Sequence, residues 1–188
     1  MYIPDLIHKL LQSTGEDPNR EGLKETPERF AKAWGFWTAG YKGSSKDILK
    51  TFESDKHDEL IFQGQLSFFS TCEHHLAPFF GMACIGYIPN GRIVGLSKLG
   101  RLLDIYARRL TIQERITTCV ADDLMNHLNA KGVGVVLHAR HLCMESRGIQ
   151  RVGTVTMTSA IRGCMEETAV RAEFFSLVAA SIQGIARP

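Results

Sequence analysis

Apolar residues in the first part of the chain recur at the spacing of amphipathic helices. One such stretch carries apolar side chains three and four residues apart, at Ile3, Leu6, Ile7, Leu10 and Leu11. A second helix is expected to begin at Thr26, as the N-cap, with Pro27 at the first helical position. Its apolar stripe reaches Trp37, Gly40 ends it, and residues 42–59 are polar. The pattern therefore predicts a helical arm over residues 1–58.

From residue 59 the pattern changes to short runs rich in β-branched and aromatic residues. Strands are expected over residues 60–68, 79–88, 133–144 and 152–159. In the third of these, side chains two apart share a face, among them Val133, Val135, Leu137, Ala139, His141 and Cys143. One helix is expected to begin with Ser97 as its N-cap. Two further helices are expected over residues 111–129 and 167–186. Grouped helices between hairpin-paired strands predict an α+β domain with an antiparallel sheet over residues 59–188.

Composition narrows the class of protein without naming a function. The residues are 44% hydrophobic and 22% charged, which is typical of a globular protein, and the length of 188 residues predicts one domain, or one domain with a small appendage. The net charge of +2 and the pI near 8.3 are too low for a general nucleic-acid binder. We find neither a membrane-spanning apolar run nor a signal peptide. The chain has five cysteines, an odd number that cannot all pair with one another. We therefore expect a cytoplasmic protein with reduced thiols and with no nucleic-acid or membrane partner.

The segment from Cys72 to His75 combines a thiol and imidazoles at metal-ligand spacing. A thiolate and an imidazole three residues apart in a turn can bind one Zn²⁺, which accepts both sulfur and nitrogen. Cys143 is the candidate third ligand, because His141 lies on the same expected strand face. Three protein ligands leave one tetrahedral position open, as in catalytic zinc sites. The alternative is that both cysteines are core residues and the histidines are ordinary surface groups.

Two further segments have both a chemical and a structural interpretation. Ser97, Lys98 and Arg101 surround a helix N-terminus, where free N–H groups favour phosphate, and Arg147 could reach the same pocket. The structural alternative is a capped helix with a solvated basic face. Glu114 could accept two hydrogen bonds from a guanine ring. Alternatively, it completes a capping box with Thr111, three residues earlier.

Five motifs taken together resemble one enzyme family. Residues 15–29, 70–75, 95–98, 113–117 and 141–148 are similar, in this order, to those of GTP cyclohydrolase I, in particular to its bacterial members. The resemblance covers residues 15–175 and departs mainly at Met82, Cys84 and residues 163–165. It implies the tunnelling fold, in which subunits associate into a β-barrel, and a decamer of two stacked pentamers. The stretches that depart lie outside the implied site.

The resemblance assigns a role to each candidate residue. It implies zinc ligands at Cys72, His75 and Cys143. Acid–base histidines are implied at His74 and His141, and Ser97 is implied in the ribose steps. The guanine anchor falls on Glu114, with Gln113 beside it. The implied ribose-triphosphate contacts are Ser97, Lys98, Arg101 and Arg147, with Arg29 entering from a neighbouring subunit.

The implied reaction begins with GTP, in the first step of folate and pterin synthesis. Water activated by zinc attacks C8 of guanine, a histidine protonates N7, formate is released, and an Amadori rearrangement precedes closure to 7,8-dihydroneopterin triphosphate. Two rivals stand beside this interpretation. One is the nitrile reductase of queuosine synthesis, which shares the fold but uses a cysteine nucleophile and no zinc. The other is a silent zinc-stabilised assembly module, which would require a fourth protein ligand.

Overall fold

The computed structural model describes residues 2–183, and these form two compact units that divide after Ala39. The first unit holds α1 (Ile3–Ser13) and α2 (Thr26–Trp37). The start of α2 differs from the expected one: Glu25 occupies the N-cap position and makes no side-chain cap, and Thr26 already lies in the helix. An aromatic cluster supports α2, because the Phe30 ring stacks on Trp34 with centroids 5.8 Å apart. The two expected N-terminal helices are thus present, with a different cap.

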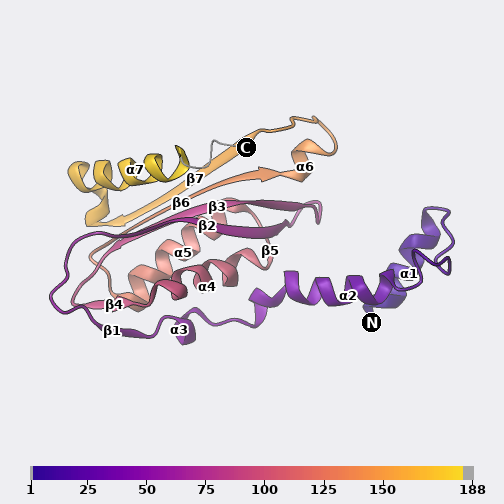
Figure 1. Ribbon diagram of the computed structural model, residues 1–188, viewed down its shortest axis with the longest axis horizontal. Helices are drawn as coiled ribbons and strands as arrows, with labels where there is room; N and C mark the ends of the chain where they lie inside the picture. The colour runs from indigo at the N-terminus through magenta and orange to yellow at the C-terminus, as the bar shows by residue number, and fades with distance from the viewer. Residues whose placement is uncertain (1, 184–188) are drawn as a thin grey trace. The chain divides into compact units, whose positions relative to one another are not determined.

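The rest of the chain alternates strands with helices (Figure 1). The helical elements are η1 (Ala39–Lys42), α3 (Ser45–Ile48), α4 (Leu96–Ala107), α5 (Gln113–Leu128), α6 (Leu142–Glu145), η2 (Cys164–Glu166) and α7 (Thr168–Gln183). The strands are β1 (Thr51–Glu53), β2 (Ile61–Cys72), β3 (Pro78–Ile88), β4 (Arg92–Val94), β5 (Leu110–Thr111), β6 (Gly132–His141) and β7 (Val155–Gly163). The expected end of α7 at residue 186 lies outside the described residues.

The main sheet has five strands in the order β5-β2-β3-β6-β7. The pairs β2–β3, β3–β6 and β6–β7 are antiparallel, and only the two-residue β5 is parallel to its neighbour. This confirms the predicted α+β class with an antiparallel sheet. A second, two-stranded sheet pairs β1 with β4, so residues 51–53 are held to the second unit. The compact units accordingly divide after Ala39, whereas the sequence placed the end of the arm at residue 58.

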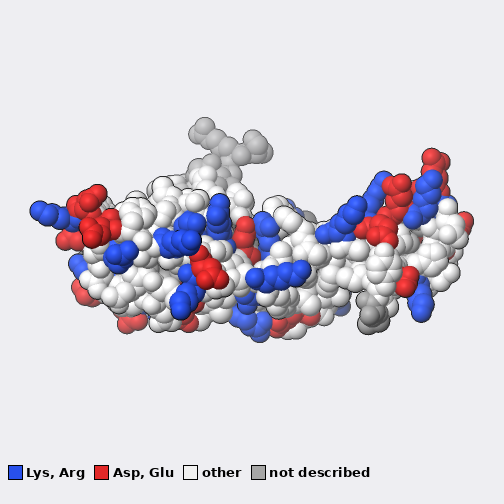
Figure 2. Space-filling view, turned by 90° about the horizontal axis from the view of Figure 1, so that it is seen from below, with Lys and Arg blue, Asp and Glu red and all other residues white. Residues whose placement is uncertain are grey.

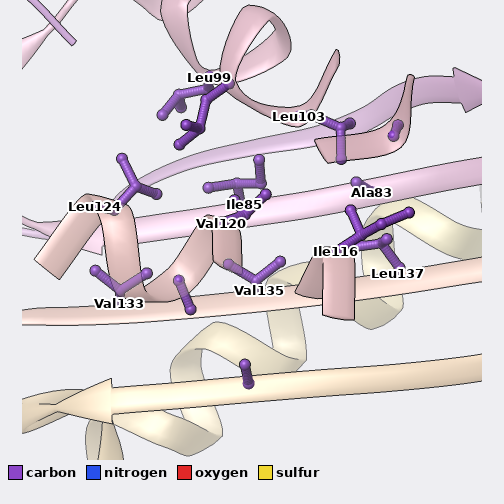
Figure 3. Packing of buried hydrophobic residues seen from close by; sticks show 14 of the residues in the cluster. Ala83, Ile85, Leu99, Leu103, Ile116, Val120, Leu124, Val133, Val135 and Leu137 are labelled. Atoms are coloured by element: carbon purple, nitrogen blue, oxygen red, sulfur yellow. The ribbon is translucent and has the colours of Figure 1, made fainter. Parts of the chain in front are cut away.

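Helices cover both faces of the main sheet, with α4 and α5 on one face and α7 on the other (Figure 1). The larger core lies under α4 and α5, where their leucines meet alternate residues of β3 and β6, including Ile85, Val133, Val135 and Leu137 (Figure 3). The smaller core joins Cys84 and Val136 to Phe174 and Val178 of α7. The alternation expected from Val133 to Ala139 is therefore confirmed, because these positions are buried under α4 and α5.

Both helix caps predicted for the second unit are wrong. Gly95, not Ser97, is the N-cap residue of α4, and Ile112 is that of α5. Thr111 cannot cap α5, because it lies in β5, where it pairs with Cys72. No side chain caps α5, so the capping box of Thr111 and Glu114 does not form. Asn129, in the left-handed conformation, ends α5 where the sequence predicted.

The surface carries charges of both signs. On the face seen in Figure 2, Lys and Arg side chains are interspersed with Asp and Glu side chains among the described residues. This distribution agrees with the small net charge of +2. Among the described helices, none combines the length and the apolar character that crossing a membrane requires.

Candidate functional site

Three residues expected to bind zinc come together at one end of the main sheet. Cys72 is the last residue of β2, His75 lies in the loop that follows, and Cys143 lies in α6. One potential ligand atom from each lies within 4.8 Å of the other two. The distance from Cys72 Sγ to His75 Nδ1 is 3.8 Å. Two thiols and one imidazole are a donor set that suits zinc, so the residues fit the ion that the sequence predicted.

The loop between β2 and β3 brings His75 back towards Cys72. The backbone N–H of Cys72 donates to the carbonyl of Ala77, and the N–H of Leu76 donates to the carbonyl of Cys72, at 2.9 Å in both cases. Leu76 closes this turn with a φ of 53°, a conformation that costs energy for a leucine. Two residues of the candidate metal group are therefore positioned by a tight local turn.

Cys143 reaches the group by a different route from the predicted one. The strand expected to run to residue 144 ends at His141, and Cys143 lies in the short helix α6. Burial raises the pKa of its thiol, and the neighbouring Cys72 thiol raises it further, because two adjacent thiolates repel each other. A bound cation would reverse this preference for the neutral thiol. A cation between the two sulfurs would thus offset the repulsion between the two thiolates.

His141 lies beside this group and is held on two sides. Its ring stacks on Phe79 of the neighbouring strand, with centroids 4.6 Å apart and planes 4° apart. Its Nε2 atom lies 2.8 Å from Oε1 of Gln113. Burial lowers the pKa of His141, and the nearby Glu114 carboxylate acts in the opposite direction. Glu114 itself is exposed in the first turn of α5.

His74 is exposed and contacts an ion pair that the sequence did not single out. Its Nε2 atom lies 3.9 Å from Glu73, whose carboxylate accepts hydrogen bonds from both terminal nitrogens of Arg115, at 2.5 and 3.2 Å. The guanidinium lowers the pKa of Glu73. This pair links the candidate metal loop to α5. Both residues occur within motifs used for the resemblance, but no spacing rule indicated that they meet.

The predicted phosphate-binding residues fall into separate groups. Ser97 and Lys98 lie in the first turn of α4, and Arg101 is exposed one turn later. Cys72, by contrast, pairs with β5, which follows the C-terminal end of α4 in the chain. Because α4 has 12 residues, its two ends are roughly 18 Å apart. Within one chain, these cations are therefore not brought to the Cys72 end of the sheet.

The two remaining cations differ in their surroundings. Arg147 is exposed just after α6, and its charge lowers the pKa of Cys143, against the larger effect of burial. It therefore lies near the candidate metal group, whereas the sequence grouped it with Ser97, Lys98 and Arg101. Arg29 belongs to α2 in the first unit and forms an ion pair with Glu25.

The fold and the site together define a class of protein. Three residues that could bind one metal ion, next to a half-buried histidine and a carboxylate, are a combination typical of metal-dependent hydrolases. The sequence model of the family described as GTP cyclohydrolase I matches residues 3–179. The chain belongs to this family of enzymes.

Individual relatives agree with this family. The chain is 56% identical over 172 residues to the GTP cyclohydrolase 1 of Nitrosospira multiformis, with 90% of each chain covered. It is 52% identical to that of a Janthinobacterium species, covering 90% of this chain and 87% of the relative. It is 49% identical to that of Campylobacter jejuni subsp. doylei, with 93% of each chain covered. A crystal structure of the archaeosine synthase QueF-Like is a distant likeness, with a TM-score of 0.46 and 16% identity over 55% of this chain and 93% of that one.

Proposed function

We propose that this enzyme is a zinc-dependent GTP cyclohydrolase that converts GTP to 7,8-dihydroneopterin triphosphate and formate. The observation that carries the proposal is the meeting of Cys72, His75 and Cys143 within 4.8 Å, next to His141, in a chain of this family. The reaction would be the first step of tetrahydrofolate and pterin biosynthesis. The five cysteines are free thiols, which suits the cytoplasm that we propose as its location.

Cys72, His75 and Cys143 would hold the zinc ion. When bound, zinc is a Lewis acid that lowers the pKa of water to about 7. Glu114 would accept hydrogen bonds from the ring N–H and the amino group of guanine, and so orient the purine. His74 or His141 would give N7 its proton when water adds at C8, and N9 would take up a proton when the bond from C8 to N9 then breaks. After hydrolysis of the formamide releases formate, Ser97 would take part in the Amadori rearrangement of the ribose before the new ring closes.

The direct test is to incubate the purified zinc-loaded enzyme with GTP. We expect formate to appear together with a product that becomes a fluorescent pterin on oxidation, in equal amounts. ATP is the matched control, because it offers the same triphosphate without the amino group and ring N–H that Glu114 would bind. GTP that stays intact, or formate without a pterin, would contradict the proposal.

The two rival functions differ in observable ways. Membership of the GTP cyclohydrolase I family argues against a nitrile reductase, and a nitrile substrate with NADPH should give no change in absorbance. A silent assembly module would require a closed metal site with four protein ligands. The candidate group among the described residues contains three. That number favours an open position and hence catalysis.

The tunnelling fold and the decamer are part of this proposal, and two features of the chain support them. β7 forms one edge of the main sheet, and β5 pairs with only Thr71 and Cys72 of β2 at the other, which leaves long strand edges for neighbouring copies. Lys98 and Arg101 also lie too far along α4 from Cys72 to serve the same site within one chain. A site shared between subunits would bring the two groups together.

We expect a particle of about ten chains of 21.0 kDa, or roughly 210 kDa, with closed symmetry. Light scattering measures the mass. A mixture of two weak variants, Cys143→Ser and Arg101→Ala, tests the shared site. When their subunits are exchanged, some sites receive both intact halves, so turnover should rise above that of either variant alone. A fully active monomer would refute the assembly, and mixing without any recovery would refute the shared site.

The triphosphate should contribute strongly to turnover. Each charge-assisted contact from Lys98, Arg101, Arg147 or Arg29 is worth about 1.5–3 kcal/mol, and this binding can hold the purine in place. We therefore expect GDP and GMP to be progressively poorer substrates and guanosine to be essentially inert. Arg101→Ala should weaken GTP binding at least about ten-fold without changing the zinc content. The control is Arg171→Ala, because Arg171 is an exposed arginine of α7, outside the proposed site. Equal processing of guanosine and GTP would contradict the role of these cations.

A further inference from the structure

The side chain of Gln113 is fully engaged within the chain. It is 1% exposed, and its Nε2 lies 3.0 Å from the carbonyl of Leu137 and 3.1 Å from the carbonyl of Thr156. The same nitrogen lies 3.1 Å from the hydroxyl of Thr158. On the other side, Oε1 faces Nε2 of His141 at 2.8 Å. Both polar atoms of this side chain therefore have partners within the chain, and its burial leaves almost no surface for a nucleotide to contact.

These partners determine which way the amide points. Carbonyl oxygens only accept hydrogen bonds, so the amide group facing Leu137 and Thr156 must be the NH₂. The hydroxyls of Thr117 and Thr158 are consistent with this direction. Thr117 donates to the backbone carbonyl of Gln113 at 2.9 Å, so Thr158 can donate to Thr117 and accept from the amide. The reverse orientation would place Oε1 against two carbonyl oxygens.

The amide in turn determines the hydrogen position on His141. Oε1 of Gln113 can only accept, so Nε2 of His141 must be the donor in the bond between them. The stacked ring of Phe79 and this bond together restrict both the tilt and the in-plane rotation of the imidazole. We propose that Gln113 is a positioning residue that holds His141 as its Nε2–H tautomer and leaves Nδ1 as the nitrogen with the free lone pair. For its effect on turnover, this inference rests on the proposed function.

Neutron diffraction from crystals of the deuterated, nucleotide-free, zinc-loaded enzyme tests the tautomer directly. At about pH 8, where an imidazole is ordinarily neutral, we expect deuterium on Nε2 of His141 and both amide deuterium atoms on the side of Leu137 and Thr156. Deuterium on Nδ1 of His141, or a reversed amide, would overturn the proposal. This measurement needs no GTP, so it stands even if the enzyme proves to have another substrate.

The second test separates positioning from substrate contact. Gln113→Met removes the amide but keeps an unbranched chain of similar length. We expect kcat for GTP to fall at least about ten-fold while KM changes by less than about two-fold, with the zinc content unchanged. The matched control is Gln63→Met, because Gln63 also has a buried amide oxygen but lies on β2 in the region paired with Ile85. That variant should keep wild-type kcat.

Two kinetic outcomes would overturn the proposal. A folded Gln113→Met enzyme with wild-type kcat would mean that the amide only fills space. A raised KM with unchanged kcat would mean that it contacts the substrate. Should this variant not fold, Thr158→Val replaces it, because it removes one partner of the amide and leaves the carbonyls of Leu137 and Thr156. We expect Thr158→Val to lower kcat by a smaller factor with KM unchanged, and wild-type kcat would count against the proposal.

Discussion

Replacing Cys143 with serine should remove most of the bound zinc and nearly all turnover while the chain stays folded. A neutral hydroxyl is a poor ligand for zinc, and losing one of three protein ligands leaves Cys72 and His75 to hold the ion alone. The fold should survive because its two cores are formed mainly by apolar side chains packed between the sheet and its helices. The expected loss of activity is several orders of magnitude.

The matched control is Cys164→Ser. Cys164 is also a partly exposed free thiol, but it lies in η2, just after the end of β7 that pairs with Gly132. This variant should keep stoichiometric zinc and normal turnover. Zinc is measured by elemental analysis and folding by circular dichroism and melting temperature. A Cys143→Ser enzyme with full zinc and normal turnover would remove Cys143 from the metal site.

Replacing Glu114 with glutamine should reduce GTP turnover by orders of magnitude at a nearly unchanged melting temperature. The amide keeps the shape of the side chain, but it loses the charge and one of the two acceptors that a guanine edge requires. The structural contribution of Glu114 is small. It is exposed, it makes no capping box, and its charge at the N-terminus of α5 is worth about 0.5 kcal/mol.

Glu173→Gln is the control for this variant, because Glu173 is an exposed glutamate in the middle of α7. It should leave turnover and melting temperature unchanged. The two variants are compared by steady-state kinetics with GTP and by thermal unfolding. If Glu114→Gln melted at a lower temperature and kept normal turnover, Glu114 would be a structural residue of α5 and not the guanine anchor.

Local sequence patterns predicted the existence and type of the main elements better than their ends. The helices α4, α5 and α7 and the long strands follow from periodicity, because each packs apolar side chains against a core, whereas α1 and α2 pack against each other. Predicted caps failed at Thr26, Ser97 and Thr111 because packing and strand pairing decide where a helix begins. Thr111, for example, is held in β5 beside Cys72.

The candidate site was predictable where its residues are close in the sequence. Cys72 and His75 are three residues apart in one turn, so their chemistry can be inferred directly. The ion pair of Glu73 with Arg115 and the contact of Gln113 with His141 join distant segments, and no spacing rule relates them. The family resemblance assigned Gln113 a place beside the guanine anchor, whereas the fold buries its side chain and turns it to His141.

The sequence by itself determined that this chain is an α+β enzyme of the GTP cyclohydrolase I family, because periodicity and short motifs are local properties. Only the tertiary structure decided which side chains of β2 face the core that contains Cys72. An irregularity between Gln63 and Leu66 shifts the register in which β2 pairs with β3. As a result, Ile61 and Phe68 both face this core, although they are an odd number of residues apart. Alternation has a period of two, so one extra residue reverses every later side chain. The register depends on pairing with β3 and on packing against α4, which no local pattern contains.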